Sequence, residues 1–254
     1  MPDPRPTGLP LVDALASLQR PTLADFVSAA SEYIVASPDL GDLALEGGVV
    51  VRPAERKKAG QIRLSNALGR ALALDLRDSY GGIDAEAGET YVSGALRVSK
   101  VDVVEVTKLD GLKLAIELKP INLAVGRAIW NRFGDIRVSA VSTHLKYPFA
   151  VAGGVLTIPT VEFLRGEWRS TEHLIVRLIE LLRRAGGRQR EDDAPHRLEG
   201  VAVVAFDPHA GTVRQDLPAV GSGLRWEEAV AALAHAYEER FAPASTQLEA
   251  AGGE

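Results

Sequence analysis

The sequence predicts an α/β protein with a mixed central β-sheet flanked by helices. Segments with helical apolar spacing alternate along the chain with segments whose apolar residues recur at every second position. Two of the strand segments are joined through Asp110-Gly111, a favoured tight-turn sequence, which predicts an antiparallel pair. A later run, 200–206, is apolar throughout, as is typical of a strand buried on both faces. These features indicate one sheet covered by helices.

The amino-terminal part is predicted to be mainly helical. Thr22 has the side chain of a helix N-cap and precedes a run with apolar residues on one face. Leucines at helical spacing then precede Gly81-Gly82, a pair that favours the end of a helix. The expected elements are helices at 11–18, from Thr22 onward and at about 61–77, and a brief strand at 49–51.

The rest of the chain is predicted to alternate between strands and helices. The segment 186–197 is charged and contains glycine, so we expect an exposed loop there. The expected strands are 101–106, 112–119, 149–158 and 200–206. The expected helices are 123–133, 136–146, a helix capped by Ser170 that ends near Gly186, and 226–241.

Composition favours one folded domain over 1–254, with flexible tails at 1–8 and 243–254. Of the 254 residues, 46% are hydrophobic and 25% are charged, which excludes a mostly disordered chain. The absence of cysteine excludes disulfides and thiolate zinc sites, so oxygen ligands are favoured for any metal. No signal peptide or membrane-spanning run is recognisable, and we therefore expect a cytoplasmic protein without a membrane partner.

The hairpin brings three ionisable side chains together. A two-residue turn pairs Leu109 with Leu112, which places Asp102 opposite Lys119 and Val104 opposite Glu117. Asp102, Glu117 and Lys119 then share one face of the hairpin. Backbone positions of the two acidic residues would be ~7 Å apart, which leaves room for a divalent cation. The opposite face is expected to carry Leu112, Leu114, Ile116 and Leu118.

Asp102 followed by Glu117-Leu118-Lys119 resembles the D…(D/E)xK signature of the PD-(D/E)xK nucleases. The order of helix, signature hairpin, helix, strand and helix over about 61–185 is similar to that family, and the flanking elements look most like a type II restriction endonuclease. The resemblance implies a restriction-endonuclease-like core and a homodimer that cuts double-stranded DNA to leave 5′-phosphate ends. It implies that Mg²⁺ is held by Asp102, Glu117 and the backbone carbonyl of Leu118, with Lys119 assisting the attack of water.

Other interpretations stay open at this stage. The polar residues would also suit the outer face of a hairpin, with Asp102 and Lys119 as a cross-strand ion pair. Glu105 is a rival first carboxylate, although the predicted register turns it to the other face, and Glu32 is a possible accessory carboxylate. Alternative functions are a repair or phage-defence nuclease acting on structured or single-stranded DNA, and a non-catalytic DNA-binding module.

Two groups of basic and polar residues are candidates for contacts with DNA. The segment 52–70 holds six Lys or Arg residues and one acidic residue, in a chain whose net charge is −5. Its arginines recur every seven residues, which places them near one line on a helix, where they could follow phosphates. The second group follows the signature hairpin. The candidates are Arg56, Arg63, Arg70, Arg127, Asn131, Arg132 and Lys146.

Overall fold

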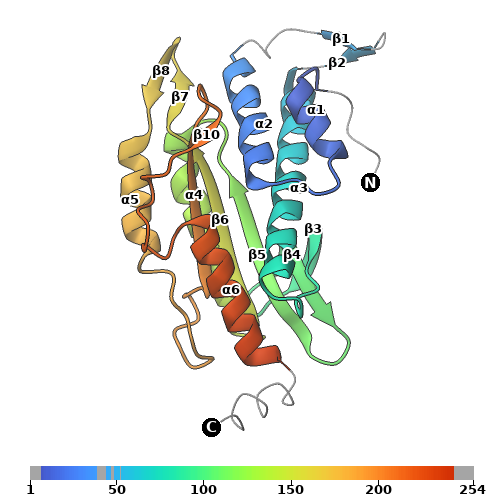
Figure 1. The fold of residues 1–254 in the computed structure, drawn as a ribbon, viewed down its shortest axis with the longest axis vertical. Coiled ribbons are helices and arrows are strands. Elements are labelled where there is room, and N and C mark those ends of the chain that lie inside the picture. The colour runs from blue at the N-terminus through green and yellow to red at the C-terminus, as the bar shows by residue number, and fades with distance from the viewer. Residues whose placement is uncertain (1–6, 39–43, 47–48, 52, 243–254) are drawn as a thin grey trace.

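The computed structural model describes residues 7–38, 44–46, 49–51 and 53–242, and its centre is a six-stranded mixed sheet (Figure 1). The strand order is β10-β9-β6-β5-β4-β3. β5, β6 and β9 run parallel to one another, whereas β3, β4 and β10 pair antiparallel with their neighbours. The predicted mixed sheet is therefore confirmed. Its strands are β3 (Glu86–Ser93), β4 (Val98–Thr107), β5 (Gly111–Pro120), β6 (Val151–Pro159), β9 (Gly200–Asp207) and β10 (Thr212–Val213).

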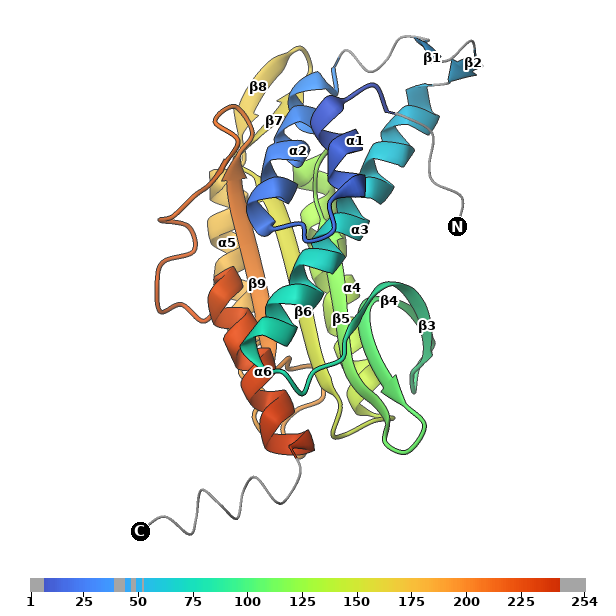
Figure 2. The ribbon, with the colours of Figure 1, turned by 45° about the vertical axis from the view of Figure 1, so that its right-hand side comes forward.

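Helices cover both faces of this sheet (Figures 1 and 2). One face packs against α3 (Pro53–Ser79) and α6 (Trp226–Phe241), which share a core with Leu114, Ile116 and Leu118 of β5. The other face packs against α4 (Val125–His144) and α5 (Glu172–Leu182). Burial of apolar side chains in these two layers is the main force that holds the fold together. None of the helices in the described part of the chain is long and apolar enough to cross a membrane.

Two further helices pack against α3, on the side of the sheet that α3 and α6 cover. They are α1 (Pro10–Ser17) and α2 (Leu23–Ala36). Thr22 caps α2 as predicted, because its hydroxyl accepts from the N–H of Asp25 while the Asp25 carboxylate accepts from the N–H of Thr22. Within the expected tail at 1–8, Thr7 is buried and its hydroxyl donates to Asp13. Residues 1–6 and the predicted tail at 243–254 lie outside the described residues.

Two small hairpins lie outside the main sheet. The expected strand at 49–51 is confirmed as β2 (Val49–Val51), which pairs with β1 (Ala44–Glu46). The second hairpin, β7 (Val161–Leu164) with β8 (Glu167–Ser170), was not expected from the sequence. Its turn places Arg165 and Gly166 in the left-handed region, as a type I′ turn requires.

Two predicted helix boundaries are wrong. The expected helices at 123–133 and 136–146 form one helix, α4, because Gly134 continues the helix instead of ending it. Close packing supports this continuity: the side chain of Ile136 fills the space where a Cβ of Gly154 would stand, with Cγ2 only 2.6 Å away. α3 begins at Pro53 instead of 61, and proline at the first position of a helix is favourable because it lacks an N–H that would need a partner.

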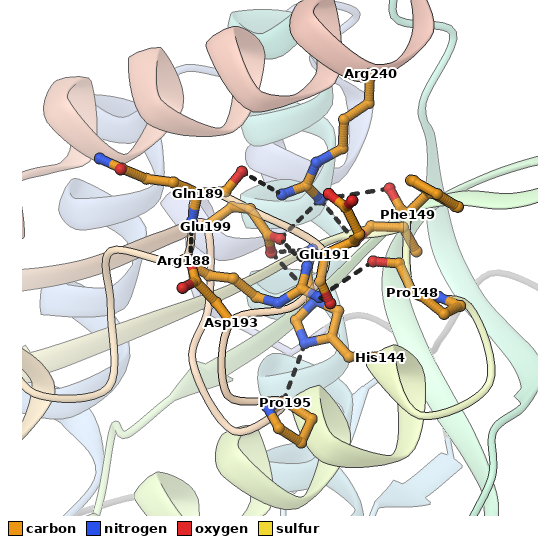
Figure 3. Close-up of polar contacts among 12 residues, drawn as sticks. His144, Pro148, Phe149, Arg188, Gln189, Glu191, Asp193, Pro195, Glu199 and Arg240 are labelled. Atoms are coloured by element: carbon orange, nitrogen blue, oxygen red, sulfur yellow. Dashed lines mark hydrogen bonds and ion pairs between the residues drawn. The ribbon is translucent and has the colours of Figure 1, made fainter.

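A buried cluster of charged side chains lies where β6 and β9 begin (Figure 3). Glu199 Oε1 lies 2.8 Å from Arg188 Nη1 and 2.7 Å from Arg240 Nη1, and Oε2 accepts from the N–H of Ala152 at 2.8 Å. His144 Nε2 lies 3.2 Å from the same Oε2, within ion-pair distance but without hydrogen-bond geometry. The cluster thereby ties α4, α6 and the loop before β9 to the sheet.

Candidate active site

The three signature residues meet where β4 separates from β5. Regular pairing between these strands ends at Val103 and Ile116. The next residue of β4, Asp102, uses its side chain in place of a strand-to-strand bond: Oδ2 accepts from the N–H of Leu118 at 2.7 Å. This bond fixes the Asp102 carboxylate beside the backbone that carries the other two signature residues.

Glu117 and Lys119 extend from β5 on one side of the sheet and form an ion pair with each other. The Glu117 side chain is only 6% exposed, and that of Lys119 is 18% exposed. Glu117 pairs with Gly154 on the neighbouring strand β6, and the side chain of Ile136 in α4 packs against Gly154. A buried carboxylate is costly unless it is paired, and here the ammonium of Lys119 provides that pairing.

The predicted register of the hairpin is wrong, although the predicted grouping survives. Val103 pairs with Ile116 instead of Leu118. At the turn, Thr107 pairs with Gly111 across three residues, 108–110, and Gly111 lies in the left-handed region. The Thr107 hydroxyl accepts from the N–H of Asp110 and stabilises this longer turn. The longer turn and one extra residue on β5 together shift the pairing at Val103 by two residues. This shift leaves Asp102, Glu117 and Lys119 on one face, since strand side chains alternate with period two.

The predicted position of Leu112 is also wrong. The register shifts again between Glu105 and Val106, because Lys113 is an extra residue on β5. Leu112 therefore joins Val104 and Ala115 in a separate apolar cluster instead of lining up with Leu114, Ile116 and Leu118. The Lys113 ammonium lies over the ring of Phe241 in α6, 5.2 Å from its centre.

The surroundings of Asp102 act on its pKa in both directions. Burial raises the pKa of Asp102 above its usual value, and the negative charges of Glu117 and Glu89 act in the same direction. The bond from the Leu118 N–H and the charge of Lys119 oppose that rise. Carboxylates that repel one another in a partly buried site gain most from a divalent ion, which neutralises them together.

The oxygen ligands at this site would suit a Mg²⁺ ion that keeps several waters better than a metal ion held by protein ligands alone. Within the described ranges, no group of three or more Asp, Glu, His or Cys side chains could hold a metal ion. Mg²⁺ prefers oxygen ligands, keeps several waters and is commonly held through one or two carboxylates. Asp102, Glu117 and the carbonyl oxygen of Leu118 would supply such a set.

The rival carboxylates have other partners. Glu105 lies on the opposite side of the hairpin, where it accepts from the hydroxyl of Tyr237 in α6 and from the N–H of Asp84. Glu32 accepts from the backbone N–H groups of Leu11 and Val12 and so caps the first turn of α1. The structure does not bring either residue to the signature site.

The structure places the arginines of α3 against the amino-terminal segment. Arg56 donates to the carbonyl of Thr7, and Arg63, which is 7% exposed, lies 3.6 Å from Asp13. Arg70 donates to the carbonyls of Leu18, Leu15 and Ala16, at the end of α1. The seven-residue spacing therefore corresponds to a line of contacts with α1, and DNA binding by these arginines stays a prediction.

The candidates on α4 are more accessible. Arg127, Asn131 and Arg132 are exposed, and Arg132 forms an ion pair with Asp135 at 3.2 Å. Lys146, just after α4, donates to the hydroxyl of Ser93 at the end of β3. These three α4 side chains and the exposed Lys146 are thus the predicted DNA contacts that are most open to a ligand.

Arg70 and Arg127 offer a direct test of which arginines stabilise the fold and which are available to bind DNA. We expect Arg70→Ala to lower the free energy of unfolding by about 1–2 kcal/mol, because it leaves the last carbonyls of α1 without their charged donor. Arg127→Ala, on an exposed helix surface, should leave stability almost unchanged and weaken DNA binding instead. Urea unfolding and fluorescence anisotropy with a labelled duplex measure the two effects. Equal stability of both variants would contradict the structural role of Arg70.

Sequence reasoning missed Glu89 and Lys100, which form an ion pair near Asp102. The available signal was Gly88, because a glycine within a strand often marks a bulge beside a functional site. β3 itself was overlooked because most of its residues are polar or exposed.

Comparison with known proteins adds no identification. No protein-family model matches the chain, and neither a curated protein nor a solved structure matches it.

Proposed function

We propose that this protein is a Mg²⁺-dependent DNA endonuclease of the PD-(D/E)xK kind. The observation that carries the proposal is the bond from the Leu118 N–H to the Asp102 carboxylate, because it joins Asp102 of β4 to the Glu117-Leu118-Lys119 segment of β5. A solvated ion pair on an outer face would not need two largely buried carboxylates beside one lysine.

The surrounding elements support the same proposal. A helix (α3), the hairpin with the signature residues (β4 and β5), a second helix (α4), a strand (β6) and a further helix (α5) follow one another along the chain. This order is similar to the one that the PD-(D/E)xK resemblance implies for a restriction-endonuclease-like core. The site lies on the sheet face that α4 covers, so the exposed polar side chains of α4 belong to the same side of the molecule.

Each residue has a defined part in the proposed hydrolysis. A bound Mg²⁺ would lower the pKa of a coordinated water and stabilise charge on the phosphate. Asp102, Glu117 and the Leu118 carbonyl would hold the ion. Lys119, whose ammonium is kept in place by Glu117, would orient the attacking water and balance negative charge as it develops. Attack in line with the leaving oxygen leaves a 5′-phosphate and a 3′-hydroxyl.

The enzyme is proposed to act on double-stranded DNA as a homodimer, since two copies would present one site to each strand. The test is incubation of the purified protein with unmethylated phage and plasmid DNA in Mg²⁺, in EDTA, and with Lys119→Ala in parallel. We expect discrete Mg²⁺-dependent fragments that disappear in the variant. A smear would indicate a non-specific or structure-directed nuclease. The absence of cleavage on a panel of DNA substrates would overturn the proposal and favour a non-catalytic DNA-binding module.

A further inference from the structure

A second charged pair lies beside the proposed active site. Lys100 of β4 and Glu89 of β3 form an ion pair at 2.5 Å, and their side chains are 47% and 53% exposed. The ring of Tyr91 lies against the same ammonium, 5.5 Å from its centre. In contrast to the buried Glu117–Lys119 pair, this pair is open to a ligand.

A β-bulge directs Glu89 toward this position. β3 pairs through Ala87 with Val103 and then through Thr90 with Val101, so two residues, Gly88 and Glu89, stand opposite Asp102 alone. Gly88 has a φ of +144°, a conformation that side-chain-bearing residues rarely adopt. Bulges of this kind redirect side chains beside functional sites. The charge of Glu89 is close enough to contribute to the electrostatic environment of Asp102.

Lys100 is placed to reach the same substrate as Asp102. The two residues are separated by one position on β4, and Glu89, the ion-pair partner of Lys100, stands opposite Asp102 on β3. A lysine side chain is long and flexible, and its compact ammonium is a suitable partner for a phosphate oxygen. A phosphodiester held at Asp102 and Glu117 would therefore bring a phosphate group within reach of Lys100.

We propose that Lys100 binds a DNA backbone phosphate next to the scissile one, and that Glu89 holds its ammonium in position while no DNA is bound. This inference rests on the proposed nuclease function. The incoming phosphate competes with the Glu89 carboxylate for the same ammonium. Glu89 therefore reduces DNA affinity, and Lys100 increases it.

The test uses fluorescence anisotropy with a labelled DNA duplex in EDTA, where binding is measured without cleavage. We expect Lys100→Gln to weaken binding several-fold and to reduce the slope of log affinity against log salt by about one, as for the loss of one phosphate contact. Glu89→Gln should tighten binding several-fold. In the double variant the gain should vanish, because the released ammonium is no longer present.

The matched control is the exposed ion pair Arg20–Asp78, at 2.9 Å. Arg20→Gln and Asp78→Asn change the same charges elsewhere on the surface, and we expect little effect on binding from either. If Lys100→Gln binds DNA with the same affinity as wild type, this inference is overturned while the nuclease proposal stands. A wild-type protein that neither binds nor cuts DNA would overturn both. Circular dichroism confirms that each variant is folded.

Discussion

Glu117→Gln is expected to reduce DNA cleavage by about 100-fold or more, whereas Glu105→Gln should leave the cleavage rate nearly unchanged. The two glutamates are a matched pair, since they lie on adjacent strands of one hairpin and are 5% and 7% exposed. Glu117 faces Lys119, and Glu105 faces Tyr237 on the other side. Glutamine keeps the size of the side chain and removes the charge that a metal ion requires.

Glu105→Gln, the variant that should leave cleavage nearly unchanged, is expected to lower the free energy of unfolding. Glu105→Gln weakens the charged hydrogen bond with the Tyr237 hydroxyl, which costs about 1–3 kcal/mol in the free energy of unfolding. The measurements are initial cleavage rates on plasmid DNA, Mg²⁺ binding by calorimetry and urea unfolding of both variants. Full cleavage by Glu117→Gln would remove the proposed active site. Equal loss of cleavage in both variants would show that the hairpin needs its buried charges for folding and not for chemistry.

Local patterns in the sequence predict most of the elements that carry this site. The leucines of α3 and the alternate residues of β5 each form one buried face. Their spacing therefore predicts a helix and a strand directly. The hairpin was placed in the wrong register because Asp110-Gly111 does not form a two-residue turn by itself. The Thr107 hydroxyl selects a three-residue turn. The longer turn alone would shift the pairing by three residues, and the extra residue Lys113 on β5 reduces the shift to two. Because a shift of two keeps the alternation of side chains, the prediction still groups Asp102, Glu117 and Lys119.

The features that sequence could not predict depend on partners distant along the chain. Arg70 is bound by carbonyl groups more than fifty residues earlier, at the end of α1. The seven-residue spacing of Arg56, Arg63 and Arg70 predicts a line of charge on α3 but does not identify the groups that it contacts. α4 continues through Gly134 because tertiary packing outweighs the low helix propensity of glycine. Glu89 gains its position from a bulge, a feature of pairing between strands and not of either strand alone.

The second large effect is expected at Glu199, whose carboxylate has no exposed surface and contacts Arg188 and Arg240 (Figure 3). Burial alone would raise its pKa, but the nearby His144 imidazole, the charge of Arg240 and the Ala152 N–H together lower it from 4.5 to about 2. A difference of that size corresponds to about 3 kcal/mol of folding free energy at neutral pH. We therefore expect Glu199→Gln to destabilise the protein by about 3 kcal/mol, which agrees with the cost of breaking a buried ion pair.

The sign of the pH dependence follows from the lowered pKa of Glu199. Between pH 4.5 and pH 2 the unfolded chain binds a proton at Glu199 that the folded chain does not, so the contribution is complete above the unfolded pKa and is lost as pH falls through this window. Urea unfolding at several pH values should show a shallower acid loss of stability in Glu199→Gln than in wild type. Glu180→Gln, an exposed residue of α5, is the control and should follow wild type. A variant as stable as wild type at pH 7, with the same acid profile, would show that the arginines find other partners and that Glu199 does not hold this end of the sheet together.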